Sequence, residues 1–286
     1  MSSTAKPAAA TSSSAPVRFL KMHGLGNDFV VIDRRKQFFR PDADEIRQLA
    51  DRQTGLGFDQ MLLLDKAARG ADLSWRIYNA DGGELQQCGN GARCVALLMA
   101  EELGRHGQEI VLQGIAGRLR AIVCDDDQVS LNTGVPNFVP PSLPFDTTSE
   151  APVYTIRLDG EEISFGAVSV GNPHIVIRVD DVDDAPVDRL GPLLETHESF
   201  PERTNVGFLQ VVDRETLNLR VFERGTGETR ACGSGACAAA SLARTWGETK
   251  EEVVVRMPGG DLTIRWPGRG QPLWMTGPAA KVYEGT

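Results

Sequence analysis

Two cysteines of this 286-residue chain occupy matching positions in a phrase that the sequence contains twice. Residues 75–96 read WRIYNADGGELQQCGNGARCVA, and residues 219–240 read LRVFERGTGETRACGSGACAAA. When the two phrases are aligned, Cys88 matches Cys232, and each cysteine directly precedes a Gly-x-Gly turn and an alanine-rich segment. A duplicated chain with one such cysteine in each half predicts a single site between the halves, where two thiols face each other.

Two facing thiols can remove a proton from one face of a carbon and return a proton to the other face. A cysteine directly before a helix lies near unpaired backbone N–H groups and the positive end of the helix dipole, which favour the thiolate. Gly89, Gly91, Gly233 and Gly235 would let a ligand approach the backbone closely, and such a helix terminus also holds a carboxylate. The pattern therefore predicts inversion of a stereocentre without a cofactor, with a carbanion-like transition state stabilised by preorganised dipoles.

Further polar residues fit a charged, polar substrate. Asn27, Asn79, Asn172 and Asn205 each follow or precede a predicted strand, and Gln60 ends the string GFDQ. In the second copy of the phrase, Glu223 and Arg224 stand where the first copy has Asn79 and Ala80. An acid beside a base can bind an amine and a carboxylate, so the halves differ where a substrate with unlike ends needs them to differ.

The duplication extends beyond the cysteine phrases and predicts two similar domains. GNDFVVI at 26–32 resembles GNPHIVI at 171–177, and GFDQ at 57–60 resembles GFLQ at 207–210. Hydrophobic periodicity predicts helices over residues 42–52, 90–103, 187–197 and 234–246 among longer runs of strands. We expect an α+β fold, in which each domain wraps a mixed or antiparallel sheet around a central helix and the active site lies in the cleft between them.

The expected organisation is a disordered tail, a first domain of two segments and a second domain between them. The tail is 1–16, the first domain 17–133 plus 278–286, and the second domain 134–277, with the proline-rich segment 136–152 as the connection.

Composition excludes several classes of protein. The net charge of −9 argues against a nucleic-acid partner. The longest apolar run, Val95–Ala100, is far too short for a membrane span, so no membrane association is expected. Five cysteines without the spacing of a secreted scaffold fit free thiols in a reducing cytoplasm.

Together, the motifs resemble those of the diaminopimelate epimerase family, in the family's order and over most of the chain from Phe19 onwards. The matching strings are KMHGLGNDFVVID (21–33), GFDQ (57–60), NADGGELQQCGNGARC (79–94), GNPHIVI (171–177), NVGF (205–208) and ERGTGETRACGSGACAAA (223–240). The resemblance implies interconversion of LL- and meso-diaminopimelate without pyridoxal phosphate, on the route to lysine and peptidoglycan. It also implies a small-molecule amino-acid substrate, no metal and a homodimer.

The resemblance also assigns roles to residues. It implies that Cys88 and Cys232 transfer the protons and that His174 lies close to them. It implies that the substrate is held by Asn27, Gln60, Asn79, Gly89, Asn90, Asn172, Asn205, Glu223, Arg224, Gly233 and Ser234.

Other interpretations stay open at this point. A sister cofactor-independent enzyme, such as a proline racemase-like or phenazine-biosynthesis-like protein, would share the fold, although the former lacks this combination of motifs and the latter lacks the cysteine pair. A non-catalytic amino-acid-binding or thiol-redox protein is a third possibility. A zinc site formed by Cys88, Cys94, Cys232 and Cys237 is disfavoured, because the spacings are wider than in most zinc knuckles. We expect Cys94, Cys124 and Cys237 to pack in the core.

Overall fold

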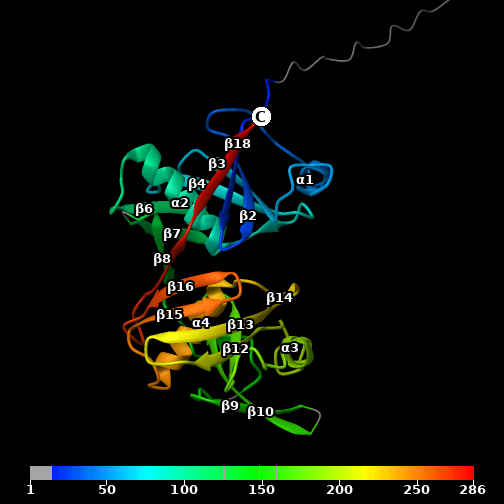
Figure 1. Ribbon diagram of the computed structural model, residues 1–286, viewed down its shortest axis with the longest axis vertical. Helices are drawn as coiled ribbons and strands as arrows, with labels where there is room; N and C mark the ends of the chain where they lie inside the picture. The colour runs from blue at the N-terminus through cyan, green and yellow to red at the C-terminus, as the bar shows by residue number, and fades with distance from the viewer. Residues whose placement is uncertain (1–14, 125, 148, 159) are drawn as a thin grey trace, which may run out of the picture.

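The protein consists of two stacked, similar α+β halves, as the sequence predicts (Figure 1). The computed structural model describes residues 15–124, 126–147, 149–158 and 160–286, so nearly all of the expected tail lies outside the described residues. The described residues form four α-helices and eighteen strands. Among them, no helix combines the length and the apolar character needed to cross a membrane.

The first half wraps one twisted sheet around a buried helix. Its strands pair in the order β1–β2 antiparallel, β2–β3 parallel, β3–β4 antiparallel, β4–β6 parallel, β6–β7 antiparallel and β7–β8 antiparallel. Helix α2 packs inside this sheet, and α1 lies in the connection from β2 to β3. The bounds are β1 (Phe19–Gly24), β2 (Asn27–Asp33), α1 (Ala43–Ala50), β3 (Gln60–Asp65), β4 (Leu73–Asn79), β5 (Glu84–Leu85), α2 (Gly89–Leu103), β6 (Glu109–Gly114), β7 (Gly117–Val123) and β8 (Gln128–Gly134).

The second half repeats this topology pair for pair. Its order is β10–β11 antiparallel, β11–β12 parallel, β12–β13 antiparallel, β13–β15 parallel, β15–β16 antiparallel and β16–β17 antiparallel, with α4 inside. The bounds are η1 (Pro140–Ser142), β9 (Tyr154–Leu158), β10 (Glu161–Ser169), β11 (Pro173–Arg178), α3 (Val187–Glu195), β12 (Asn205–Val211), β13 (Thr216–Glu223), β14 (Gly227–Thr229), α4 (Gly233–Thr245), β15 (Glu252–Met257), β16 (Gly260–Arg265) and β17 (Leu273–Pro278). The last strand, β18 (Ala280–Gly285), belongs to the first half.

Strand register corrects one detail of the sequence alignment. Phe29 of β2 pairs with Gln60 of β3, and the matching His174 of β11 pairs with Asn205 of β12. Gln60 therefore corresponds to Asn205, and the match between the GFDQ and GFLQ strings is wrong. The two connections that precede these strands, 34–59 and 179–204, have equal length. A four-residue likeness is too short to fix the alignment across such a loop.

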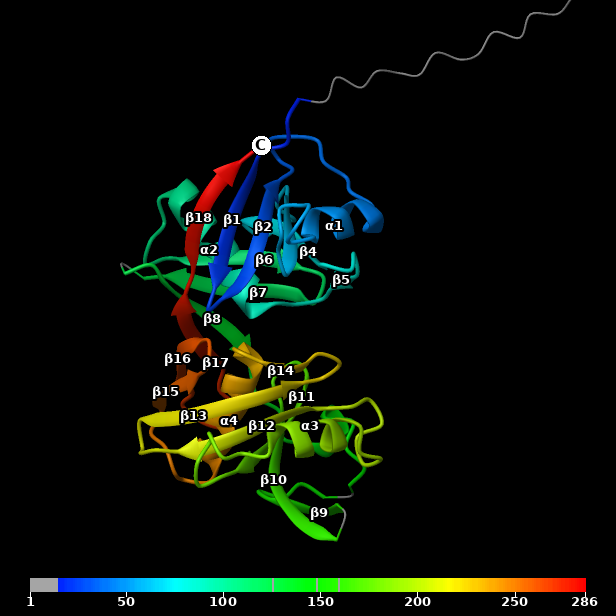
Figure 2. The same ribbon diagram turned by 45° about the vertical axis from the view of Figure 1, so that its right-hand side comes forward.

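The two halves are joined by the pairing of their last strands. Strand β17 of the second half runs antiparallel to β8 of the first, with Met275 opposite Leu131. The chain then returns to the first half, where β18 pairs antiparallel with β1 (Figure 2). The division into 17–133 plus 278–286 and 134–277 as independent domains stays a prediction.

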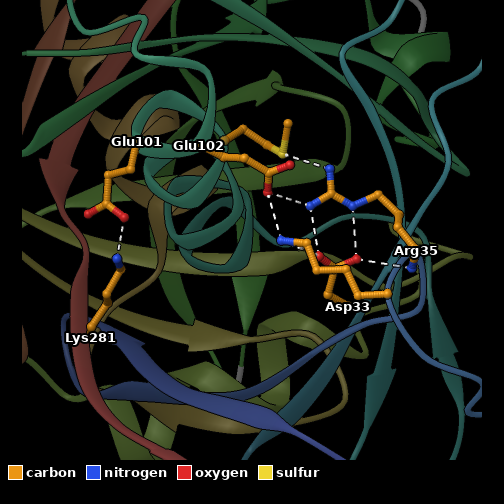
Figure 3. Close-up of polar contacts among 7 residues, drawn as sticks. Asp33, Arg35, Glu101, Glu102 and Lys281 are labelled. Atoms are coloured by element: carbon orange, nitrogen blue, oxygen red, sulfur yellow. Dashed lines mark hydrogen bonds and ion pairs between the residues drawn. The ribbon is translucent and has the colours of Figure 1, made fainter.

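Ion pairs at the end of α2 hold the returning strand and the end of β2 (Figure 3). Lys281 of β18 forms an ion pair with Glu101. Arg35 lies in the turn after β2. Its Nη2 atom is 2.8 Å from Asp33 Oδ2 and 2.7 Å from Glu102 Oε2. The exposed Lys281–Glu101 pair contributes at most about 1 kcal/mol, whereas the Arg35–Asp33 pair is half-buried. Both pairs orient these segments.

The two central helices are rich in small residues because sheet surrounds them. In α4 every residue from Gly235 to Ala243 is buried, and in the corresponding stretch of α2 every residue except the half-buried Leu98 is buried. Helix α2 ends at Gly104, whose φ of 63° is the left-handed conformation that glycine tolerates best. Larger side chains would push the surrounding strands apart, which explains the alanine-rich composition.

We predict that Gly166→Ala destabilises the second half. A Cβ at Gly166 of β10 would lie 2.6 Å from Trp246 Cζ2 and 2.7 Å from Leu242 Cδ2, so a packed helix would have to move. Overpacking of this kind lowers the free energy of unfolding by about 1–3 kcal/mol. The matched control is Gly207→Ala on β12, where the nearest atom to the new Cβ is 3.4 Å away. Urea denaturation should separate the two variants, and equal stability would contradict the packing argument.

Candidate active site

Each of the two cysteines forms the N-cap of a central helix. Cys88 and Cys232 have extended backbones, with φ of −147° and −124°. The thiol sulfur of Cys88 accepts a hydrogen bond from the Gly91 N–H at 3.5 Å, and that of Cys232 accepts one from the Gly235 N–H at 3.4 Å. The two copies of the phrase thus fold into the same local structure, in which the sulfur satisfies a backbone donor of the first helical turn.

One methionine lies between the N-termini of the two helices. A Cβ at Gly89 would lie 3.0 Å from Met275 Cε, and a Cβ at Gly233 would lie 2.9 Å from Met275 Sδ. The residue before Cys88 also approaches the other half, because Gln87 Oε1 lies 3.9 Å from the position of a Cβ at Gly171. The cysteine-bearing helix termini therefore lie next to each other across the joint.

The surroundings of Cys88 are amides and a distant cation. The Cys88 thiol lies 3.7 Å from Asn27 Oδ1, which also accepts a hydrogen bond from Asn90 Nδ2 at 3.3 Å. Asn27 in turn donates to Asp59 Oδ2 at 3.1 Å. Burial raises the pKa of the Cys88 thiol, while the Gly91 N–H and the charge of Arg93 act in the opposite direction.

The surroundings of Cys232 are acidic. The Cys232 thiol donates a hydrogen bond to Glu223 Oε2 at 3.1 Å, and Ser234 Oγ lies 3.5 Å from the sulfur. The other carboxylate oxygen of Glu223 accepts a hydrogen bond from Thr229. Burial raises the pKa of Cys232 well above its ordinary value, and the negative charge of Glu223 raises it further. The thiol form of Cys232 is therefore strongly favoured.

A partly buried polar network extends from Ser234 through the second half. Asn172 Nδ2 donates to Ser234 Oγ at 3.4 Å, and Asn172 Oδ1 lies 3.1 Å from His174 Nε2. Burial, with a smaller contribution from the charge of Arg224, lowers the pKa of His174 to about 3, so its ring is neutral at physiological pH. Asn205 Oδ1 accepts a hydrogen bond from the Arg224 N–H at 3.0 Å, which fixes the turn after β13.

The matching residues of the first half also interact. Gln60 Nε2 donates to Asn79 Oδ1 at 3.1 Å, and these residues start β3 and end β4. Gln60 Oε1 is buried and has no hydrogen-bond partner within residues 15–124, 126–147, 149–158 and 160–286. A buried acceptor without a donor is costly, so it suits a ligand that carries an N–H or ammonium group.

All fourteen residues singled out in the sequence lie on the two helix termini or on the strand ends and turns around them. Gly89 and Asn90 lie in the first turn of α2, and Gly233 and Ser234 in the first turn of α4.

Two residues next to the candidate site residues were not predicted from the sequence. Arg93 is completely buried and bonds Asn90, and its place in an alanine-rich helix was the available signal. Met275 comes from a distant strand, and nothing in its local sequence points to it.

The other three cysteines are not among the candidate site residues. Cys94 and Cys237 are buried in the core, as expected, whereas Cys124 is only half-buried at the end of β7. In the part of the chain that the structure describes, no group of three or more His, Cys, Asp or Glu side chains is arranged to hold a metal ion.

Solved structures share the fold at low sequence identity. A hydroxyproline epimerase from Agrobacterium vitis, solved with bound trans-4-OH-L-proline, has a TM-score of 0.66 at 17% identity, covering 94% of this chain and 91% of that chain. A phenazine biosynthesis protein from Bacillus anthracis has a TM-score of 0.63 at 14% identity, covering 94% and 98%. At such identities the likeness shows the fold alone.

Sequence comparison is more specific. The sequence profile of the family described as diaminopimelate epimerase matches residues 19–139 and 166–282. A diaminopimelate epimerase from Alkalilimnicola ehrlichii is 50% identical over 274 residues, which cover 94% of this chain and 98% of that protein. The chain therefore belongs to the diaminopimelate epimerase family.

Proposed function

We propose that this protein interconverts LL- and meso-2,6-diaminopimelate by a two-base transfer of protons at Cα, with Cys88 and Cys232 as the two bases. The observation that carries the proposal is the pair of cysteine N-caps on adjacent helix termini in a chain of this family. The reaction supplies precursors for lysine and peptidoglycan. The mechanism uses no cofactor, because both protons move to and from side chains.

The proton balance requires the two cysteines to start in opposite states. A thiolate removes the Cα proton and becomes a thiol, while the opposite thiol donates its proton to the other face and becomes a thiolate. The carbon is inverted, and the two sulfurs have exchanged states. General acid–base catalysis of this kind contributes about 10²–10⁴-fold, so most of the acceleration must come from stabilising the carbanion-like transition state.

The helix termini are suited to that stabilisation. The first-turn N–H groups of α2 and α4 are not used within the helices, and both positive helix ends point to the joint. We assign Gly89, Asn90, Gly233 and Ser234 to the substrate's α-carboxylate, whose charge grows as the proton leaves. Their N–H groups are fixed in place before the reaction, so they need little reorganisation in the transition state.

The side chains around the termini fit the rest of the substrate. Glu223 is the carboxylate beside Cys232, so it suits the α-ammonium next to the reacting carbon. Arg224 is exposed and suits the distant carboxylate. The amide residues Asn27, Gln60, Asn79, Asn172 and Asn205 provide neutral donors and acceptors, and neutral His174 supports Asn172 without adding charge. We further propose that the enzyme works in the cytoplasm as a homodimer.

The function is tested by proton NMR of the purified protein with LL-diaminopimelate in D2O under reducing conditions. We expect loss of the Cα–H signal and appearance of the meso isomer, without added pyridoxal phosphate. Proline and other amino acids serve as competing substrates in parallel tubes. Exchange with proline alone would favour a sister racemase, and the absence of any exchange would favour a binding or redox protein.

We predict that Cys88→Ala and Cys232→Ala each lower kcat for epimerisation by at least about 10²-fold, because each removes one of the two proton carriers. The matched control is Cys124→Ala, which changes a half-buried cysteine outside the site and should keep near wild-type turnover. Circular dichroism should show that the fold is retained. Near wild-type epimerisation by either site variant would refute the two-base assignment.

Arg224→Met is expected to raise KM for diaminopimelate by roughly ten- to a hundredfold, because a charge-assisted hydrogen bond to a carboxylate is lost. The free energy of unfolding should change little, since the side chain is exposed. Arg214→Met, an exposed arginine in the turn between β12 and β13, is the control for loss of one positive charge. Unchanged KM and kcat in Arg224→Met would exclude the assigned role.

A further inference from the structure

Arg93 is a fully buried cation in the helix that Cys88 caps. Its side chain is 0% exposed and lies in a slot beside two glycines. A Cβ at Gly24 would lie 3.1 Å from Arg93 Nη2, and a Cβ at Gly277 would lie 3.4 Å from Arg93 Nε. The glycines of β1 and β17 thus make room for a guanidinium at the joint between the halves. Such a buried charge is rare unless it is paired or has a function.

No carboxylate forms an ion pair with Arg93 in the described residues. Its Nε donates to Pro278 O at 3.0 Å and its Nη2 to Asn90 Oδ1 at 2.7 Å, while Nη1 is buried without a hydrogen-bond partner among those residues. The ionisable groups whose charges act on it are the thiols of Cys94, Cys88 and Cys237. Arginine stays protonated in proteins, so a thiolate among these three would be its counter-ion.

Of the three thiols, Cys88 is the best placed to ionise, although burial raises its pKa too. Burial raises the pKa of both Cys94 and Cys237 to about 12, so these two stay thiols. Cys88 alone has free backbone donors of a helix terminus at its sulfur. The charged groups that act on Cys88 are Arg93 of its own helix and Glu223 of β13 in the other half, which oppose each other.

Arg93 also fixes the amides beside Cys88. Because Asn90 Oδ1 accepts from Arg93, Asn90 Nδ2 must point to Asn27 Oδ1, and that oxygen faces the Cys88 thiol. An acceptor beside the sulfur favours the thiol. Ionisation of Cys88 therefore depends on the helix N–H groups and on the positive charge of Arg93.

The duplication provides an internal comparison. Position 93 corresponds to position 237 of the second half, so arginine in one copy stands where the other copy has a neutral cysteine. In the same alignment, Glu223 beside Cys232 corresponds to the neutral Asn79. One half has thus placed a cation near its catalytic cysteine, and the other half has placed an anion.

We propose that Arg93 is a positioning residue whose buried charge makes Cys88, and not Cys232, the thiolate of the substrate-free enzyme, and whose hydrogen bond orients Asn90. The inference rests on the proposed function, in which these cysteines are the two bases. In the first turnover of the substrate-free enzyme, Cys88 therefore abstracts the proton of the substrate and Cys232 donates one.

The test is alkylation of the full-length, substrate-free protein by iodoacetamide across a pH series, with each cysteine peptide quantified by mass spectrometry. In the wild type, the midpoint of the pH–rate profile should be lower for Cys88 than for Cys232. Arg93→Gln should raise the Cys88 midpoint by about one pH unit, which is about tenfold in rate below the midpoint, and should leave Cys232 unchanged. Arg93→Lys, which keeps a cation, should restore most of the wild-type rate.

Two controls keep the outcome decisive. Arg120→Gln removes an exposed cation from β7, the strand that packs on α2, and should leave both midpoints in place. If Arg93→Gln does not fold, Arg93→Met replaces it, since an apolar group of similar volume avoids an unpaired buried polar group. A Cys88 midpoint at or above that of Cys232 in the wild type, or an unchanged midpoint in a folded neutral variant, would overturn the proposal. Because no substrate is present, these results are independent of whether diaminopimelate is turned over.

Discussion

The antiparallel pairing of β8 with β17 is the constraint on which the site depends. Each half on its own is a sheet wrapped around a helix, and each presents one helix terminus with a cysteine cap. The pairing of the two last strands places those termini side by side, and Met275 of β17 contacts both first turns. Backbone hydrogen bonds of a sheet are numerous and inflexible, so the joint sets the relative position of the two sulfurs within narrow limits.

The cysteine caps join structure and chemistry in the same atoms. An N-cap is ordinarily Ser, Thr, Asp or Asn, whose oxygen accepts a first-turn N–H. Here the cysteine sulfur takes that role, so the N–H groups at the start of the helix also stabilise the negative charge of a thiolate. A substrate carboxylate would use the remaining N–H groups of the same turns. The local structure therefore requires no separate oxyanion site.

The sequence predicted the duplication, the α+β class and the central helices because those features leave strong local patterns. It did not reveal strands β6, β7 and β8, because apolar residues such as Val111 and Ile122 occupy the less buried side of these strands and obscure the alternation in the sequence. The wrong match of GFDQ with GFLQ shows the same limit, since strand register depends on pairing partners and not on a short likeness. Met275 could not be found, because its role arises only from the pairing of β17 with β8. Buried Arg93 was detectable in principle, as the one charged residue among the apolar and small residues 91–100 of α2.

The corrected register shows where the two similar halves differ around their cysteines. Gln60 corresponds to Asn205 and Asn79 to Glu223, so the candidate residues form equivalent pairs around two equivalent cysteines. A strictly symmetric site could hold one thiol and one thiolate, but it would not favour either sulfur as the thiolate. Burial alone raises both pKa values. The charges that break the symmetry separate the two sulfurs, because the cation in the helix of Cys88 and the carboxylate beside Cys232 both favour ionisation of Cys88 over that of Cys232.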